Sequence, residues 1–234
     1  DEDLVGDRMD TNVISVTTME DQESVAEKFK KYDLTAMPVV DGENRLVGIV
    51  TVDDAIDVME EEATEDIEKM AAMTPSDKPY LKTSVWDIYK HRIPWLMLLM
   101  VSATFTGLII TKFEHALAAQ VVLTAYIPML MDTGGNSGSQ SSVTIIRGLS
   151  LSEIHFKDIF AVLWKEIRVA VLCGLSLAVV NFAKLLLLDR VGAQVALVVS
   201  LTLVVTVAAA KFIGCTLPLL AKKIGFDPAV MASP

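Results

Sequence analysis

Four long apolar segments constrain the fold of this chain more than any other feature of its sequence. They cover roughly residues 93–111, 117–146, 160–188 and 193–220. Because about 20 helical residues cross a hydrocarbon core of ~30 Å, each segment is long enough to span a membrane. The sequence therefore predicts an α-helical transmembrane domain with four spans.

Polar and glycine-rich residues interrupt the second of these segments. The run 128–140 has the sequence Pro-Met-Leu-Met-Asp-Thr-Gly-Gly-Asn-Ser-Gly-Ser-Gln. Backbone inside a bilayer leaves its amides unpaired only where they face protein or water. The run therefore predicts irregular, carbonyl-rich backbone beside a polar cavity, and such a cavity favours an ion pathway.

Charge divides the chain into two parts near residue 77. The first 77 residues hold 22 acidic and 6 basic side chains, whereas the remaining residues hold 8 and 14, which together give the net charge of −10. The first part is acidic and polar, and the second is apolar and basic. Two domains fit this division.

Basic residues between the spans predict how the chain is oriented in the membrane, because Lys and Arg collect in cytoplasmic loops. They gather before the first span, between the second and third, and after the fourth, at Lys82, Lys90, Arg92, Arg147, Lys157, Lys165, Arg168, Lys222 and Lys223. We therefore expect a multi-pass protein of the cell membrane with a cytoplasmic N-terminal domain. Lys211 instead lies deep in the fourth span, where a charge usually faces a cavity or a partner.

Short apolar strands alternate with helices in the N-terminal part. Strands are predicted at 13–16, 37–41 and 46–51, with one helix at 24–32 and another from Val52 onward. This order, with Ala-Met-Pro-Val-Val-Asp at 36–41 and Leu-Val-Gly-Ile-Val-Thr-Val-Asp-Asp at 46–54, resembles a cystathionine-β-synthase (CBS) domain. We expect an α/β CBS domain over residues 1–57.

The resemblance to CBS domains also implies a site for an adenine nucleotide such as ATP. In nucleotide-binding members a Ser or Thr and an Asp three residues later hold a ribose, and Thr51 and Asp54 match this pair. A carboxylate can accept hydrogen bonds from ribose hydroxyls. The same spacing at a helix start is equally a capping arrangement, so the sequence leaves both interpretations open.

Carboxylates are dense in the helix that follows Asp54. Like charges at i, i+3 and i+4 repel and weaken a helix unless cations screen them. The alternative is a solvated helix face, which is the usual position of a charge run. Asp21, Glu23 and Asp33 add carboxylates in the same small domain, and Mg2+ and Ca2+ prefer oxygen ligands. The pattern therefore favours regulatory cation binding.

An acidic CBS-like domain, an acidic connecting helix and the apolar spans follow one another along the chain. The spans carry the motif Pro-x-x-x-x-x-Gly-Gly-Asn-x-Gly-x-Gln at 128–140 and Phe-Asp-Pro-Ala-Val-Met-Ala-Ser-Pro at 226–234. This combination resembles the MgtE family of magnesium channels. The resemblance implies a homodimer with a pore between subunits, closed by Mg2+ bound to the cytoplasmic domains, and no nucleic-acid partner. It places a connecting (plug) helix and linker at 58–92 and a transmembrane pore domain at 93–234.

The resemblance also assigns two groups of residues. The pore group is Gly134, Gly135, Asn136, Ser139, Gln140 and Ser233, with carbonyls near Gly135 facing a hydrated ion. The group that binds regulatory Mg2+ is Asp21, Glu23, Asp33, Asp54, Asp57, Glu62, Glu65, Asp66 and Asp227, with a cation bridging Asp66 to Asp227. The family has a fifth span that supplies a pore aspartate, so we expect a further helix beyond Pro234 to complete the pore.

Two other classes of protein fit parts of the sequence. A transporter of Mn2+ or Co2+ would use the same oxygen ligands, whereas the scattered His91, His115 and His155 argue against a dedicated zinc site. A membrane-anchored CBS sensor of nucleotides or cations would need no Gly-Gly-Asn run. An enzyme is not expected, because the sequence holds no Gly-x-Ser-x-Gly motif and no P-loop.

Overall fold

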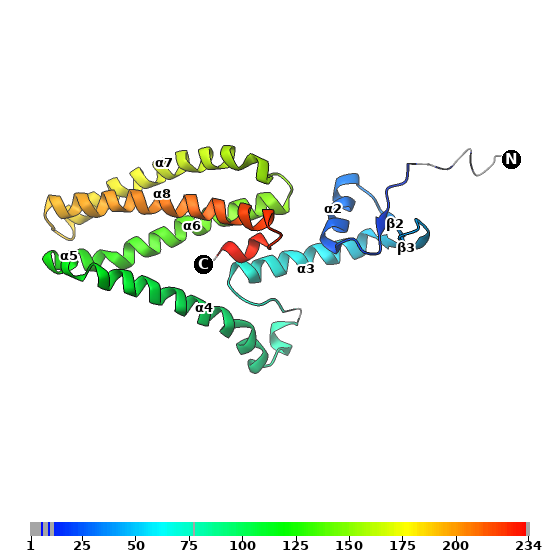
Figure 1. Cartoon of the computed structure of the whole chain (residues 1–234), viewed down its shortest axis with the longest axis horizontal. Coiled ribbons are helices and arrows are strands. Elements are labelled where there is room, and N and C mark those ends of the chain that lie inside the picture. Colours follow the sequence, from blue (N-terminus) through cyan, green and yellow to red (C-terminus); the bar gives the residue numbers. More distant parts are fainter. Residues whose placement is uncertain (1–5, 7–8, 10–11, 77, 233–234) are drawn as a thin grey trace. The chain divides into compact units, whose positions relative to one another are not determined.

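Two compact units make up the chain, and they divide between residues 66 and 67. The computed structural model describes residues 6, 9, 12–76 and 78–232. Figure 1 shows the helices and strands of both units in chain order.

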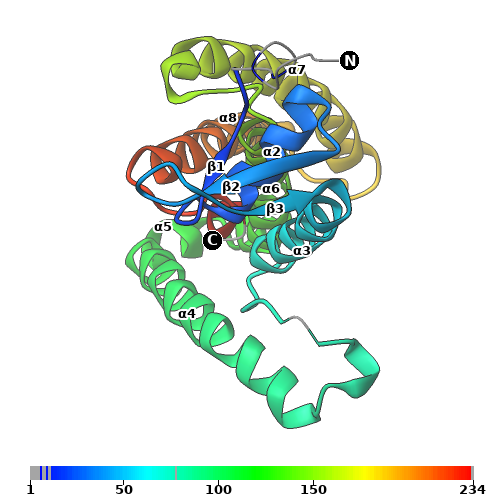
Figure 2. The same ribbon diagram turned by 90° about the vertical axis from the view of Figure 1, so that its right-hand side faces the viewer.

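A three-stranded sheet with helices beside it forms the first unit (Figure 2). The elements are β1 (Val16–Thr17), α2 (Gln22–Tyr32), β2 (Ala36–Val40), β3 (Leu46–Thr51) and α3 (Val52–Met70), which continues past the division. β2 is the central strand, parallel to β1 and antiparallel to β3. Val16, Phe29, Met37 and Ala55 form a buried core, so α2 and the start of α3 both pack on the sheet.

Polar side chains set the ends of these elements. Asp21 Oδ2 accepts a hydrogen bond from Ser24 N at 3.4 Å and caps the start of α2. Asp41 Oδ1 accepts from the backbone N–H groups of Glu43 and Arg45, each at 2.9 Å, which closes the turn between β2 and β3. The predicted architecture, an N-terminal α/β domain followed by a helical membrane domain, is confirmed. The first strand, β1, covers only Val16–Thr17, so it is shorter and begins later than the strand predicted at 13–16.

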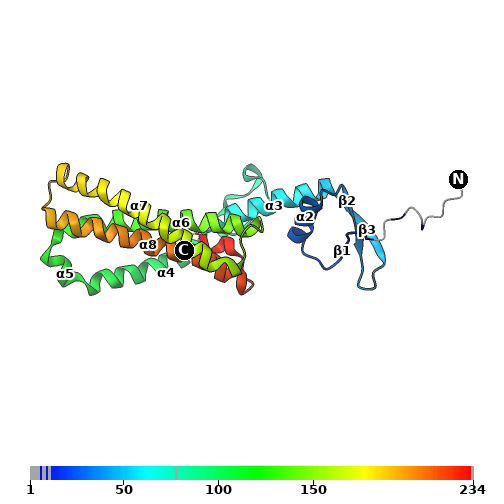
Figure 3. The ribbon, with the colours of Figure 1, turned by 90° about the horizontal axis from the view of Figure 1, so that it is seen from above.

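Helices form the second unit. After the turn η1 (Tyr80–Lys82) come α4 (Val85–Lys112), α5 (Glu114–Ala119), η2 (Val121–Tyr126), α6 (Ile127–Ser150), η3 (Phe156–Asp158), α7 (Ile159–Leu187), α8 (Ala193–Lys223) and η4 (Pro228–Ala232). α6, α7 and α8 run alongside one another (Figures 1 and 3), and α8 packs against both of the others.

Three helical segments in the described part of the chain are long and apolar enough to cross a membrane. They are Val85–Lys112, Phe156–Leu187 and Ala193–Lys223. They coincide with the predicted first, third and fourth spans. The predicted second span, 117–146, is wrong at its start, because the chain turns at Gln120 (φ −142°, ψ 69°) and α6 begins only at Ile127. Pro128 suits the start of α6. Proline has no backbone N–H, and an N–H group in the first turn would have no partner within the helix.

The irregular backbone predicted at 128–140 is also wrong, because α6 is a continuous α-helix. Two of its glycines, Gly134 and Gly138, lie where α6 meets α8. A Cβ atom on Gly134 would lie 2.8 Å from Thr206 Cγ2, and one on Gly214 of α8 would lie 2.3 Å from the Gly138 carbonyl oxygen. Small residues let helix backbones approach closely, and this packing offsets the low helix propensity of glycine.

Candidate functional site

α6 has two different faces. Its buried face carries small residues such as Ser137, Ser141 and Ser142 and packs against neighbouring elements. Its opposite face is exposed and carries four of the six predicted pore residues: Gly135, Asn136, Ser139 and Gln140. Their spacing keeps them on one side of a helix, because residues three and four positions apart share a face. The helix therefore gathers these four residues although its backbone is regular.

The other two predicted pore residues do not belong to this group. Gly134 lies on the buried face of α6, against Thr206 of α8. Ser233 lies outside the described residues. The exposed face thus carries only four of the six predicted pore residues.

An open cavity of about 490 Å³ lies between α6 and α7, and Lys211 of α8 also lines it. Asn136 and Gln140 line its α6 side together with Thr133 and Ser137. α7 contributes Ser176 and the apolar Leu172, Cys173 and Leu177. Amide and hydroxyl groups of this kind can bind the water shell of an ion without carrying charge. Sequence analysis missed three of the polar residues that line the cavity: Thr133, Ser137 and Ser176. The helical spacing of Thr133 and Ser137 around Asn136 is a signal for two of them, whereas nothing in the sequence brings Ser176 to this place.

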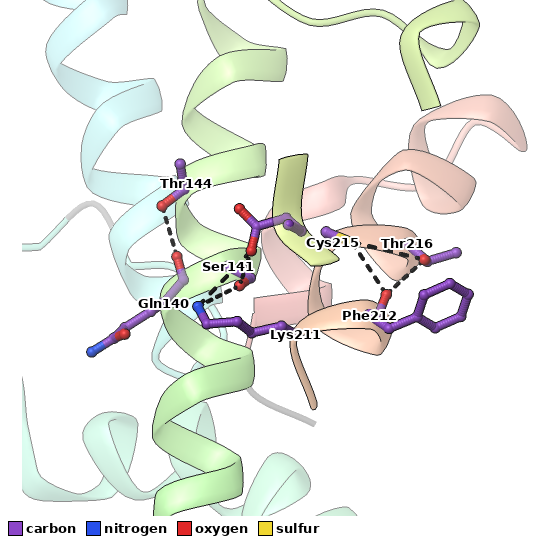
Figure 4. Close-up of polar contacts among 8 residues, drawn as sticks. Gln140, Ser141, Thr144, Lys211, Phe212, Cys215 and Thr216 are labelled. Atoms are coloured by element: carbon purple, nitrogen blue, oxygen red, sulfur yellow. Dashed lines mark hydrogen bonds and ion pairs between the residues drawn. The ribbon is translucent and has the colours of Figure 1, made fainter. Parts of the chain in front are cut away.

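Polar contacts join three helices beside this cavity (Figure 4). Lys211 Nζ on α8 donates a hydrogen bond to Ser141 Oγ on α6 at 3.1 Å. Ser141 Oγ in turn donates to Glu166 Oε2 on α7 at 2.7 Å, and Lys211 Nζ lies 3.9 Å from the same carboxylate oxygen. The position of Lys211 agrees with the expectation that a lysine deep in a span faces a cavity or a partner. Sequence analysis missed Glu166.

The predicted regulatory carboxylates of the first unit lie on α2 and α3 and at their ends. Asp21 caps the start of α2. Asp33 follows the last residue of this helix, and its backbone is in the left-handed conformation, with φ 51°. Glu62 Oε1 accepts a hydrogen bond from Gln22 Nε2 at 2.9 Å, which joins α3 to α2. The remaining members of the group lie on the same two helices: Glu23, Asp54, Asp57, Glu65 and Asp66.

Thr51 and Asp54, the predicted nucleotide contacts, bind each other. Asp54 Oδ2 accepts hydrogen bonds from Thr51 Oγ1 at 2.7 Å and from Thr51 N at 3.2 Å. These bonds are those of a cap at the start of α3, the alternative that the sequence left open. The nucleotide site itself stays a prediction.

Asp227, the predicted carboxylate of the membrane domain, has a cationic partner. Its Oδ2 lies 2.5 Å from Lys69 Nζ near the end of α3, and its Oδ1 accepts a hydrogen bond from Ala229 N at 2.8 Å. Within the residues that the structure describes, no three His, Cys, Asp or Glu side chains are placed to hold a metal ion. The predicted regulatory carboxylates of the first unit thus form no such group among the described residues of one chain, and their role stays a prediction.

Residues 127–234 match the family model of MgtE, a divalent cation transporter, and residues 4–61 match the model of a CBS domain. Residues 127–234 of this chain, which hold α6, α7 and α8, therefore resemble the MgtE family. The chain is 41% identical over 236 residues to the magnesium transporter MgtE of Thermus thermophilus and 38% identical over 233 residues to that of Bacillus subtilis. The Enterococcus faecalis protein of the same name is 30% identical over 239 residues.

These alignments cover 98% or more of this chain, and the chain spans about half the length of the curated relatives it matches. The predicted resemblance to the MgtE family and the predicted CBS domain are confirmed. The MgtE match starts at Ile127, the first residue of α6, so the polar face and the residues that line the cavity lie within it. The functions of individual residues stay predictions.

Proposed function

We propose that this chain forms part of an MgtE-type channel for Mg2+ uptake across the cell membrane. The observation that carries the proposal is the polar face of α6, which lines a cavity among helices long and apolar enough to span a membrane. Polar residues inside a membrane domain are costly and usually face the bundle interior or a water-filled cavity. The relatives named above, 30% to 41% identical, are called magnesium transporters, which supports Mg2+ as the ion.

A largely hydrated ion suits this face. Mg2+ gives up its water reluctantly and is usually held through several of its waters. Because α6 is a continuous helix, most of its carbonyls already accept helical hydrogen bonds. In the proposal, side-chain oxygens of Asn136, Ser139 and Gln140 contact the water shell instead of free carbonyls. Gly135 leaves space for that shell, because no atom lies within 4 Å of where its Cβ would be.

A second subunit completes the pathway in this proposal. The polar face is exposed in one chain, whereas polar groups at membrane depth need cover from protein or water. Two copies of α6 facing each other across a homodimer axis would give that cover. The acidic N-terminal unit lies in the cytoplasm, on the side of the basic loops. A transport role of this kind requires no catalytic chemistry.

We also propose that Mg2+ bound to the acidic unit regulates the channel. Carboxylates on α2 and α3 bind the ions through water and across subunits, which needs no cluster of three groups in one chain. When Mg2+ is abundant, bound ions cancel the repulsion between these carboxylates and hold the plug helix closed. Asp227 takes part only if Mg2+ displaces Lys69 from its carboxylate.

Uptake into liposomes tests the transport function. The chain is reconstituted as it stands, and also extended at residue 234 by the following segment of the Thermus thermophilus relative. We expect Mg2+ flux in at least the extended form, and we expect Asn136→Ala to lower it. Val205→Ala, on an exposed apolar position of α8, is the control and should keep the flux. Competition with Mn2+ and Co2+ identifies the preferred ion.

The alternative is a membrane-anchored sensor. It would be favoured if Asn136→Ala does not change the flux while the N-terminal unit still binds Mg2+ or ATP.

Three neutral substitutions test regulation. In the variant Asp57→Asn, Glu65→Gln, Asp66→Asn, internal Mg2+ should inhibit the flux only at higher concentration. The matched control changes three other acids of α3 by the same charge: Asp53→Asn, Glu60→Gln and Glu61→Gln. Unchanged inhibition in the first variant, or equal loss of inhibition in both, would overturn this mechanism.

ATP binding at Thr51 and Asp54 is a separate part of the proposal. Thr51→Ala removes the hydroxyl that now binds Asp54. If the pair holds a ribose, this variant should bind ATP more weakly in calorimetry. If the pair only caps α3, ATP affinity should stay the same.

A further inference from the structure

Lys211 brings a positive charge to the proposed route of a cation. Its side chain is buried, with the residue 5% exposed, and it lines the same cavity as Asn136 and Gln140. Like charges repel strongly where little water separates them. A pathway for a divalent cation therefore requires that this ammonium group be neutralised or held away from the ion.

Glu166 supplies the opposite charge from α7. Its carboxylate lies 3.9 Å from Lys211 Nζ, and the two side chains are 14% and 6% exposed. Salt screens a pair with so little exposure much less than it screens a surface pair. The two charges therefore cancel locally, beside the cavity.

Ser141 determines where the ammonium group lies. Ser141 is 2% exposed and belongs to the buried face of α6, whereas the neighbouring Gln140 belongs to the exposed polar face. Its hydroxyl accepts from Lys211 and donates to Glu166, so a single oxygen joins the two charged groups. This arrangement draws the lysine toward the buried face of α6.

We propose that Glu166 is a positioning residue for cation passage: through Ser141 it holds the Lys211 ammonium at the buried face of α6 and cancels its charge beside Asn136 and Gln140. The proposal rests on the transport function above. Simple structural support is the competing role, because breaking a buried ion pair also destabilises a protein. A second substitution that restores the zero net charge of the network separates the two roles.

The test uses the chain extended at residue 234 as described above. It compares Mg2+ flux in liposomes for wild type, Glu166→Gln and the double variant Glu166→Gln, Lys211→Met. Glu166→Gln leaves an uncompensated positive charge, so we expect flux at low external Mg2+ to fall at least about tenfold. The double variant has no net charge in the network, as in wild type, and should recover to within about threefold of wild-type flux. Thermal unfolding in detergent shows which variants are folded.

Each outcome decides the proposal. Normal flux in folded Glu166→Gln overturns it, and so does a folded double variant that remains as slow as the single one, because structural support would then explain the loss. If Glu166→Gln does not fold, the double variant decides: flux near wild type supports the proposal, and low flux overturns it. Absence of flux in the extended wild type would instead refute the transport function, and the positioning role with it.

Discussion

The contact between Gly138 and Gly214 determines how closely α6 approaches α8. A Cβ on Gly214 would lie 2.3 Å from the Gly138 carbonyl oxygen, so the backbones must separate to admit one methyl group. We expect Gly214→Ala to destabilise the helical unit by ~1–3 kcal/mol or more, the usual cost of overpacking. Thermal unfolding in detergent measures this. Gly107→Ala in α4 is the control, because nothing lies within 4 Å of its Cβ position. Equal melting temperatures for the two variants would contradict the expectation.

Glu20 gives the first unit a pH-dependent contact. Its carboxylate pairs with the Lys28 ammonium group and accepts a hydrogen bond from Thr17 N at 3.3 Å. The hydrogen bond from Lys28 lowers the pKa of Glu20 below its ordinary value of 4.5, against the opposing effect of burial. The contact therefore stabilises the fold above that ordinary value and is lost as the pH falls through the lower folded-state pKa.

Hydrogen exchange in α2 can test this contact. Glu20→Gln should speed amide exchange at neutral pH, because the charged partner of Lys28 is gone. The difference from wild type should vanish in acid, once the wild-type carboxyl is protonated as well. Glu61→Gln, an exposed change on α3, serves as the control and should leave α2 unaffected. A difference that persists in acid would mean that the carboxylate charge is not responsible.

Among the elements, α6 shows best what sequence could and could not predict. The polar run contains Asn136 and Gln140, which line a cavity, and their role in a pore stays a prediction. The conformation was wrong, because glycine was taken as a sign of irregular backbone. The signal for a regular helix was the pairing of Gly134 and Gly138 with Thr206 and Gly214 of α8, about 70 residues later, and a single sequence does not show which residues meet across such a distance.

Thiol labelling can test whether the exposed face of α6 meets water. With Cys173→Ala and Cys215→Ala as background, Asn136→Cys and Gln140→Cys should react with a water-soluble, membrane-impermeant reagent. Ser142→Cys on the buried face should not react, since Ser142 is 1% exposed. Leu201→Cys is the decisive control, because Leu201 is exposed but lies on an apolar surface of α8 that lipid would cover. Equal labelling of Leu201→Cys and Asn136→Cys would contradict a water-filled pathway.

Across the whole molecule, sequence predicted the elements better than their contacts. Hydropathy located three spans correctly, because the thickness of a bilayer sets their length. The strand and turn pattern located the sheet of the first unit. The network of Lys211, Ser141 and Glu166 was not predictable beyond the lysine itself, because its members come from three helices and meet only when α6, α7 and α8 pack.

Charge separates the two units and predicts that they respond differently to Mg2+. The first 66 residues carry 20 acids against 5 basic side chains, and repulsion between acids three or four positions apart weakens α3. Mg2+ should therefore slow amide exchange in α2 and α3 relative to K+ at equal ionic strength, and leave α7 and α8 unchanged. The variant Asp57→Asn, Glu65→Gln, Asp66→Asn should exchange at the same rate with either ion. If K+ slows α3 as much as Mg2+ does, the effect is general screening, and specific binding at these carboxylates is wrong.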